Sequence, residues 1–355
     1  MKSLHMFLFV WPLVFSCGPT TKWKDLNNNK IKDPYENTDL SFEERAANLV
    51  NKMTLDEKIS QMQREAPAIE RLGITKYSWG NEVLHGVVSW MSGEGFTTTV
   101  FPQSIGIAST WNPGLVSQEA EVISDEARAL ANQLENAKFL SFWSPMINMA
   151  RDPRWGRTQE SYGEDPFLVS EISKAFIKGL QGNDPKYIKT AASIKHFIAN
   201  NVDYHRHYGS SNIREKLLRD YYFPAFKANI LESNVQIVMS AYNSLNNVPC
   251  SSNDWLLQKV LRDDWGFDGH VVSDCGAIYN IHANHFYVDS PEEGAASAVL
   301  AGTDLNCGGM YTTHLARAVE LGLLTEKDLN KAVTRIITTA MRLGVFDPKD
   351  QISFA

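Results

Sequence analysis

From Ser41 onward, short apolar runs alternate with longer amphipathic stretches along the chain. This alternation is typical of repeated strand–helix units rather than of a β-sandwich or a helical bundle. Roughly seven or eight such units fit one closed (β/α)8 TIM-like barrel, which we predict as a single domain over residues 41–347. A doubly wound open sheet is the alternative, but no glycine-rich phosphate loop follows any expected strand. The expected strands end in Tyr77-Ser78-Trp79, Ser104-Ile105-Gly106, Phe142-Trp143-Ser144-Pro145, Ser193-Ile194-Lys195-His196, Ile237 to Tyr242, Val271 to Asp274 and Thr303-Asp304-Leu305, and the expected helices cover 113–134, 166–180, 215–232 and 291–300.

The first residues form a separate segment. Lys2 precedes an apolar run over residues 6–15 that is too short to span a bilayer and is typical of an export signal. Residues 14–17 resemble a bacterial lipoprotein processing site with Cys17 as the lipidated residue, and an ordinary signal peptide is the alternative. We therefore predict export, either to the periplasm or outer membrane as a lipoprotein or as a secreted protein, with membrane attachment only through this anchor. Residues 1–17 are interpreted as the signal, 18–40 as a polar linker and 348–355 as a truncated tail.

Charge and cysteine content exclude two classes of protein. The net charge of −7 is spread along the chain, without the basic block that a nucleic-acid partner would require. Beyond Cys17 only Cys250, Cys275 and Cys307 remain. Because this number is odd and the core is large, we expect small buried side chains rather than a disulfide framework.

The linker contains a sequence similar to a calcium-binding loop. Oxygen-bearing side chains stand at the first, third, fifth, ninth and twelfth positions, whereas Lys30 occupies the sixth position, where such loops need glycine for a sharp turn. A polar linker of similar composition is the alternative. A structural calcium ion would be held by Asp25, Asn27, Asn29, Asp33 and Glu36.

Reactive side chains recur where the expected strands end. Barrel enzymes carry their active sites at this edge, so residues far apart in sequence would meet there. Asp274, which follows the strand segment Val271-Val272-Ser273, could instead cap the next helix. The candidate residues at this edge are Glu82, Arg157, Lys195, His196, Tyr242 and Asp274.

The segment 151–166 is too long and too charged for a minimal connection. Arg157 within it offers a forked donor for the vicinal hydroxyls of a sugar. Its other charged residues could simply pair with one another, which is the plainer interpretation of Arg151, Asp152, Glu164 and Asp165.

Lys195 and His196 are adjacent, and strand alternation would send them to opposite faces unless a strand end or bulge intervenes. A barrel lyase or aldolase that uses Lys195 as a Schiff base is one alternative function. The adjacent His196 and the lack of a phosphate-binding loop argue against it.

Several of these segments together resemble glycoside hydrolase family 3, most closely its β-xylosidase and β-glucosidase branch. The resemblance covers nearly the whole chain after the signal, and it is specific because the motifs occur jointly. It rests on Met53 to Lys58, Thr98 to Gln103, Gly156 to Glu160, Lys195-His196-Phe197, Ser240 to Asn243, Asn247-Val248-Pro249 and Gly269 to Asp274.

The resemblance implies a (β/α)8 barrel and a retaining exo-glycosidase that acts on oligosaccharides without a required cofactor. Asp274 would be the nucleophile of a double displacement. Glu82, Arg157, Lys195, His196 and Tyr242 would then hold the terminal sugar, and the cations among them would keep Asp274 ionised.

The same resemblance points to a pentose substrate. Many glucosidases of the family carry aspartate where this chain has Glu82, and the extra methylene extends the carboxylate toward the space of a hexose C6 group. Residues 81–86, 273–277 and 303–308 are also similar to the β-xylosidase and arabinosidase branch. We therefore expect a β-xylosidase, with a β-glucosidase as the alternative.

One departure concerns the general acid, which typical members carry in a second α/β domain. No residue of this chain matches that position. His205 and His207 do not match the spacing of the histidine–aspartate dyad in the family's single-domain members and are interpreted as surface residues. A fragment of a longer enzyme, or a sugar-binding lipoprotein that has lost turnover, are therefore further expectations.

Overall fold

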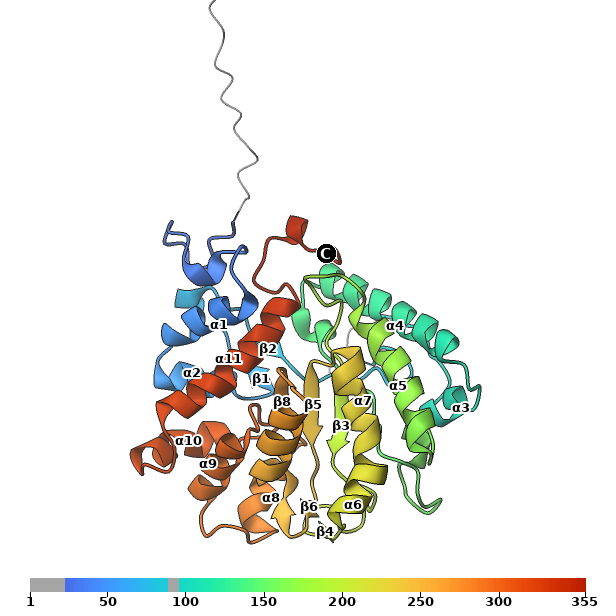
Figure 1. Cartoon of the computed structure of the whole chain (residues 1–355). Coiled ribbons are helices and arrows are strands. Elements are labelled where there is room, and N and C mark those ends of the chain that lie inside the picture. The colour runs from blue at the N-terminus through green and yellow to red at the C-terminus, as the bar shows by residue number, and fades with distance from the viewer. Residues whose placement is uncertain (1–22, 89–95) are drawn as a thin grey trace, which may run out of the picture.

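The computed structural model describes residues 23–88 and 96–355, in which helices surround a small set of central strands (Figure 1). The central sheet is parallel and contains β3 (Ser193–Phe197), β5 (Ile237–Ser240) and β8 (His270–Ser273) in that order. Every residue of these strands is buried, as expected for a parallel sheet covered on both faces. The chain therefore has an α/β fold built on a parallel sheet.

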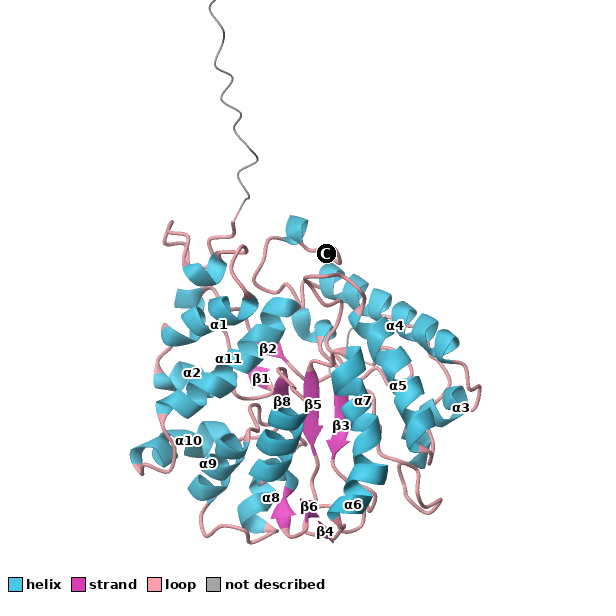
Figure 2. Ribbon diagram, viewed as in Figure 1, coloured by secondary structure: helices cyan, strands magenta, loops and turns pink. Residues whose placement is uncertain are grey.

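The helices cover this sheet in chain order, and short strands lie at its margins (Figure 2). The helices are α1 (Phe42–Asn51), α2 (Leu55–Gln61), α3 (Ser104–Ala108), α4 (Pro113–Gln133), α5 (Pro166–Gln181), α6 (Glu215–Leu217), α7 (Phe223–Ser233), α8 (Ala277–Ala283), α9 (Pro291–Ala301), α10 (Met310–Glu320) and α11 (Glu326–Arg342). The short strands are β1 (Glu65–Ala66), β2 (Tyr77–Ser78), β4 (Ser210–Ser211), β6 (Ser244–Leu245) and β7 (Val248–Pro249).

The expected helices are confirmed, and their ends follow local chemistry. Asn112 and Asp165 accept a backbone N–H of the first turns of α4 and α5, and proline occupies the first helical position in both. Ser290 and Glu293 form a capping box at the start of α9. The predicted helix over 215–232 is present as α6 and α7, joined by a π-helical segment over 218–222.

One predicted strand is wrong, because Ser104-Ile105-Gly106 lies within helix α3. Pro102 and the extended Gln103 precede this helix, and its apolar side chains Ile107 and Ala108 are buried on one face. A short apolar run does not distinguish a strand from a helical turn by periodicity. The spacing of Pro102 before the run was the available signal for a helix start.

Two further predicted strands are present only as isolated bridges. Ser141 pairs with Ala191 and Met146 pairs with Lys195, whereas Leu305 pairs with Val272. The central parallel sheet contains three strands, β3, β5 and β8, so closure into an eight-stranded barrel stays a prediction.

The two ends of the described chain are joined through α1 and α11, which pack against each other (Figure 1). Arg45 of α1 forms a fully buried ion pair with Asp347, which follows α11. Asp347 also accepts a 2.7 Å hydrogen bond from the Tyr187 hydroxyl. Removing either charge would leave the other buried without its partner.

The predicted signal over residues 1–17, with Cys17, lies outside the described residues. Within the ranges 23–88 and 96–355, no helix combines the length and the apolar content that a bilayer span requires.

Candidate active site

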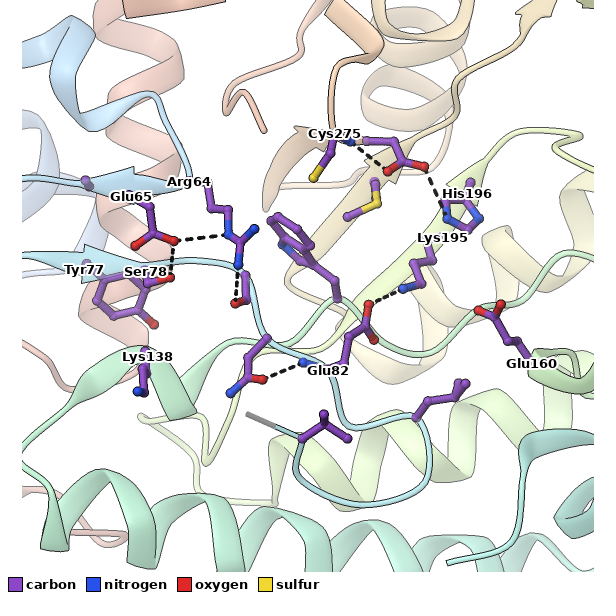
Figure 3. Close-up of a pocket in the computed structure, with 18 of the residues that line it drawn as sticks. Arg64, Glu65, Tyr77, Ser78, Glu82, Lys138, Glu160, Lys195, His196 and Cys275 are labelled. Carbon is purple, nitrogen blue, oxygen red and sulfur yellow. Dashed lines mark hydrogen bonds and ion pairs between the residues drawn. The ribbon is translucent and has the colours of Figure 1, made fainter. Parts of the chain in front are cut away.

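A cavity of about 1150 Å³ lies beyond the carboxyl ends of the parallel strands (Figure 3). Its walls come from the turn after β2, the 151–166 loop and the ends of β3, β5 and β8. The structure therefore brings together side chains that are widely separated in sequence. All candidate residues of this edge line the cavity, namely Glu82, Arg157, Lys195, His196, Tyr242 and Asp274.

Asp274 follows β8 directly, and its side chain faces the cavity. Its Oδ1 atom accepts a 2.7 Å hydrogen bond from the backbone N–H of Cys275. The buried Oδ2 atom has no hydrogen-bond partner among the described residues. Burial raises the pKa of Asp274, while the Cys275 N–H and the charges of Lys195 and Arg157 oppose this rise. The expected cationic effect is therefore present, but burial outweighs it.

Lys195 and Glu82 point toward each other across the cavity (Figure 3). The Lys195 Nζ atom lies 2.5 Å from Glu82 Oε1, and the Ser144 hydroxyl donates a 2.5 Å hydrogen bond to Glu82 Oε2. Both oxygens of Glu82 are therefore engaged, which fixes the carboxylate in position. The Lys195 Nζ atom is engaged by Glu82 rather than free as a nucleophile, which argues against a Schiff-base role.

The β3 strand presents both Lys195 and His196 to the cavity. Its pairing with β5 shifts register between Ile194 and Phe197, which confirms the expected irregularity at this strand end.

The His196 ring is fully buried and neutral. Asn148 fixes its orientation, because Asn148 Nδ2 donates to the His196 carbonyl (2.9 Å) and Asn148 Oδ1 accepts from the His196 backbone N–H (2.7 Å). The ring Nδ1 atom lies 3.2 Å from the same acceptor, so we assign the proton to Nδ1. Burial and the charges of Arg157 and Lys195 hold the pKa of His196 well below its usual range.

Arg157 completes this chain of contacts. The unprotonated Nε2 atom of His196 accepts from Arg157 Nη1 at 3.1 Å, while Glu160 binds the other side of the guanidinium in a bidentate pair at 2.7 Å. His196 Nε2 also lies 3.4 Å from Asp274 Oδ2, but a neutral ring makes no ion pair there. The guanidinium is thus held on the wall of the cavity that contains Asp274.

Tyr242 is held on three sides by Arg206, His207 and His285. The Arg206 guanidinium lies 5.0 Å from the centre of its ring, and His207 packs edge-on at 4.6 Å. His285 Nε2 contacts the Tyr242 carbonyl at 2.9 Å. Burial and the charge of Asp274 raise the pKa of the phenol, so its hydroxyl stays protonated.

The interpretation of His205 and His207 as surface residues is correct only for His205, which is exposed. His207 is half-buried, packs on Tyr242 and contacts Asn280. Arg206 lines the cavity and was missed, because it lies in an irregular loop and does not directly follow a strand. The available signal was the run His205-Arg206-His207 between two tyrosines.

The cysteine prediction is wrong for two of the three residues. Cys275 and Cys307 form a disulfide, whereas Cys250 is free and buried as expected. Cys275 follows Asp274 directly and lines the cavity. The bridge joins β8 to the segment whose Leu305 pairs with Val272. The count of three cysteines after Cys17 is odd because one of them, Cys250, is a free buried thiol, while the other two form the disulfide.

The charged residues of the 151–166 loop pair with one another only in part. Asp152 binds Arg154 on the surface, and Asp165 caps α5 by accepting from Leu168 N–H. Arg151 instead lies over the ring of Tyr222. The carbonyl of Glu164 accepts from the Tyr221 hydroxyl.

The residues expected to bind calcium do not form a ligand cage. Lys30 adopts the left-handed conformation (φ 64°) that such loops require at this position. However, Asp33 pairs with Lys52, and both oxygens of Glu36 accept backbone N–H groups, from Leu26 and Asp33. In the described part of the chain, no three acidic, histidine or cysteine side chains gather as metal ligands. The residues Asp25, Asn27, Asn29, Asp33 and Glu36 thus do not fit a bound ion in this arrangement.

Comparisons with known proteins agree with this geometry. Residues 29–339 match the model of the glycosyl hydrolase family 3 N terminal domain. A xylan 1,4-beta-xylosidase of Xylanibacter ruminicola is 41% identical over 336 residues, which are 91% of this chain and 38% of that protein. Beta-D-xylosidase 3 of Arabidopsis thaliana is 39% identical over 330 residues, or 89% of this chain and 42% of that protein.

Solved structures show the same likeness. A GH3 exo-beta-xylosidase in complex with a xylobiose aziridine activity-based probe has a TM-score of 0.85 at 33% identity, covering 90% of this chain and 43% of that one. Beta-glucosidase 3B of Thermotoga neapolitana in complex with glucose has a TM-score of 0.71 at 28% identity, covering 85% and 43%. The chain thus spans less than half the length of these relatives. Its matched residues establish that it belongs to glycosyl hydrolase family 3 and contains the N-terminal domain of that family.

Proposed function

We propose that this chain provides the sugar-binding site and the nucleophile of a retaining, exo-acting β-glycosidase that acts on β-xylosides of plant-type oligosaccharides. The observation that carries the proposal is the Asp274 carboxylate, which has one fixed and one free oxygen and lies among Lys195, Arg157 and Tyr242. Its relatives named as β-xylosidases support the substrate class.

In this mechanism the free Oδ2 atom of Asp274 attacks the anomeric carbon, and the glycosidic bond to the leaving group breaks. Water later cleaves the glycosyl–Asp274 ester and releases the sugar with retained configuration. The charges of Lys195 and Arg157 favour the ionised form of Asp274 in which it is nucleophilic. Glu82, Lys195, Arg157 and neutral His196 would bind the hydroxyls of the terminal sugar. No step requires a cofactor.

The proton for the leaving oxygen is a separate requirement. The other carboxylates that line the cavity are Glu65, Glu82 and Glu160, and they are ion-paired with Arg64, Lys195 and Arg157. None of these described groups is free to act as the acid beside Asp274. We infer that efficient hydrolysis of natural substrates needs an acid from elsewhere, whereas activated substrates need little protonation.

Glu82 supports a pentose over a hexose. Its two oxygens are fixed by Lys195 and Ser144, so the carboxylate cannot swing away to admit a C6 hydroxymethyl group without breaking these contacts. One methylene discriminates by about 1–3 kcal/mol, so a β-glucosidase remains the second candidate.

Two further parts of the proposal concern the fold and the location. Three backbone hydrogen bonds between separate segments support continuation of the sheet toward a barrel. In these bonds the N–H groups of Arg64, Trp79 and Trp143 donate to the carbonyls of Asn306, Arg64 and Asn81, respectively.

The Cys275–Cys307 bridge supports export to an oxidising compartment, such as the periplasm or the cell exterior, with Cys17 as the proposed lipid attachment site.

The test is mass spectrometry after incubation with 2,4-dinitrophenyl 2-deoxy-2-fluoro-β-xyloside, followed by peptide mapping. We expect a pentosyl adduct on Asp274, because the leaving group needs little protonation and the fluorine slows release of the intermediate. The Asp274→Asn variant is the matched control and should stay unlabelled. A faster adduct with the matching glucoside would favour the β-glucosidase. No adduct with either sugar would favour a sugar-binding protein without turnover.

A further inference from the structure

A second cavity of about 390 Å³ lies beside the candidate active site. It is lined mainly by residues 199–211, the segment that connects β3 to β4 beyond the carboxyl end of β3 (Figure 1). Arg206 lines both cavities, and its guanidinium lies over Tyr242. The two cavities are therefore neighbours on either side of the Arg206 side chain.

The second cavity is lined by three asparagine side chains that carry buried, unpartnered amide atoms. Asn200 is 1% exposed, and among the described residues neither its Oδ1 nor its Nδ2 atom has a hydrogen-bond partner. Asn243 is 5% exposed, and its Oδ1 atom and Oδ1 of Asn201 likewise have no partner within the part of the chain that the structure describes. The orientation of the Asn243 amide is fixed, because its Nδ2 atom donates to the carbonyls of Ile198 and Ser244 at 3.1 Å.

Such groups indicate the chemistry of a ligand. An unsatisfied buried amide costs on the order of 1–3 kcal/mol, so the site favours an occupant that supplies the missing bonds. Asn200 needs both a donor and an acceptor, and a hydroxyl group provides both. A metal cation would satisfy only the oxygens and would be repelled by Arg206. The donors and acceptors together therefore suit a neutral polyhydroxyl molecule.

An aromatic wall completes the cavity. Tyr208 is 55% exposed, and its ring packs edge-on against His205 with centroids 5.1 Å apart. The Tyr208 hydroxyl lies 2.5 Å from His205 Nδ1, which holds the ring in place. A flat aromatic ring beside amide groups can receive the apolar face of a sugar while the amides bind its hydroxyls.

We propose that this second cavity is a subsite for a further sugar unit of the same oligosaccharide whose terminal sugar lies at Asp274. The chain of sugars would pass over Arg206, between Tyr242 and Tyr208. This inference rests on the proposed function and adds a prediction that the function alone does not make. The affinity for xylo-oligosaccharides should rise with chain length, and the rise should depend on Asn200 and Tyr208.

The test is calorimetric titration of the whole chain with xylose and with xylotetraose. Wild type should bind xylotetraose more tightly than xylose. Tyr208→Ala should weaken xylotetraose binding about tenfold, equivalent to about 1.4 kcal/mol, and leave xylose binding unchanged. Tyr208→Phe should retain most of the affinity, because it keeps the ring. Tyr204→Ala is the matched control, since Tyr204 is 83% exposed and does not line the cavity.

Asn200→Leu provides a second variant, whose folding is checked by circular dichroism, and Tyr208→Ala keeps the test valid if it misfolds. Equal affinity of wild type for both sugars, or equal losses for both in Tyr208→Ala, would show that the cavity holds only water. Wild type that binds neither sugar would contradict the proposed function itself and this subsite with it.

Discussion

The Cys275–Cys307 bridge makes a quantitative prediction, because it closes a loop with a sequence separation of 32 residues beside the proposed nucleophile. A disulfide that closes a loop of this length lowers the entropy of the unfolded chain, which stabilises the folded protein by about 3.7 kcal/mol at 25 °C. The double variant Cys275→Ala/Cys307→Ala should therefore lose about this much free energy of unfolding. Its sugar affinity should also fall, since the bridge lies next to the backbone N–H that positions Asp274.

The assay is urea unfolding followed by tryptophan fluorescence, with and without reductant. Wild type should lose stability when reductant is added, whereas the double variant should not respond, because its only remaining described cysteine, Cys250, is unpaired. A variant within about 1 kcal/mol of oxidised wild type would refute the loop-closure reasoning. A variant that responds to reductant as wild type does would show that another bond is responsible.

Three other changes test separate parts of the structure. Glu119 is 5% exposed, and its Oε2 atom has no partner among the residues that the structure describes. Burial raises the pKa of Glu119 to about 7, so its contribution to stability is present below pH 4.5 and lost as the pH rises through 7. The free energy of unfolding of Glu119→Gln should thus exceed that of wild type by about 2–3 kcal/mol at pH 8 and should equal it at pH 4. Equal melting temperatures of the two proteins at pH 8 would contradict this. Arg45→Met should cost about 3–5 kcal/mol in urea unfolding by leaving Asp347 buried and unpaired, and Arg45→Met/Asp347→Leu should recover part of that loss. Glu82→Asp should raise glucose affinity relative to xylose about tenfold in calorimetric titration, and an unchanged ratio would separate Glu82 from sugar selectivity.

The sequence located Lys195, His196, Tyr242 and Asp274 because they stand in or just after apolar runs that form strands, whereas Arg157 was found from the length and charge of its loop. Parallel strands bring their carboxyl ends to one edge, so Lys195, Tyr242 and Asp274 meet there whatever the exact number of strands. The same reasoning failed at Ser104, where a short apolar run belongs to a helix. Strand pattern thus locates residues at strand ends more reliably than it counts strands.

The missed features depend on contacts between separate loops. Pairing of Cys275 with Cys307 follows from the adjacency of two strand ends, which cysteine spacing does not reveal. Arg206 lines the active-site cavity because its loop places the guanidinium over the ring of Tyr242. Asparagine is common in ordinary loops, so Asn200 and Asn243 do not stand out in the sequence. Their amide atoms that lack hydrogen-bond partners among the described residues are recognised only from the burial and the contacts in the structure.

The wide spacing in sequence of the cavity residues has a consequence for any preparation of the protein. Under the proposed function, residues from Glu82 to Cys275 must be in place before a sugar can bind, so partly folded molecules should have no affinity for it. A ligand that binds only the native state stabilises it by about 2.7 kcal/mol at a hundred times its dissociation constant. The number of sugar molecules bound per chain therefore counts native molecules, and added sugar would select the folded fraction during refolding.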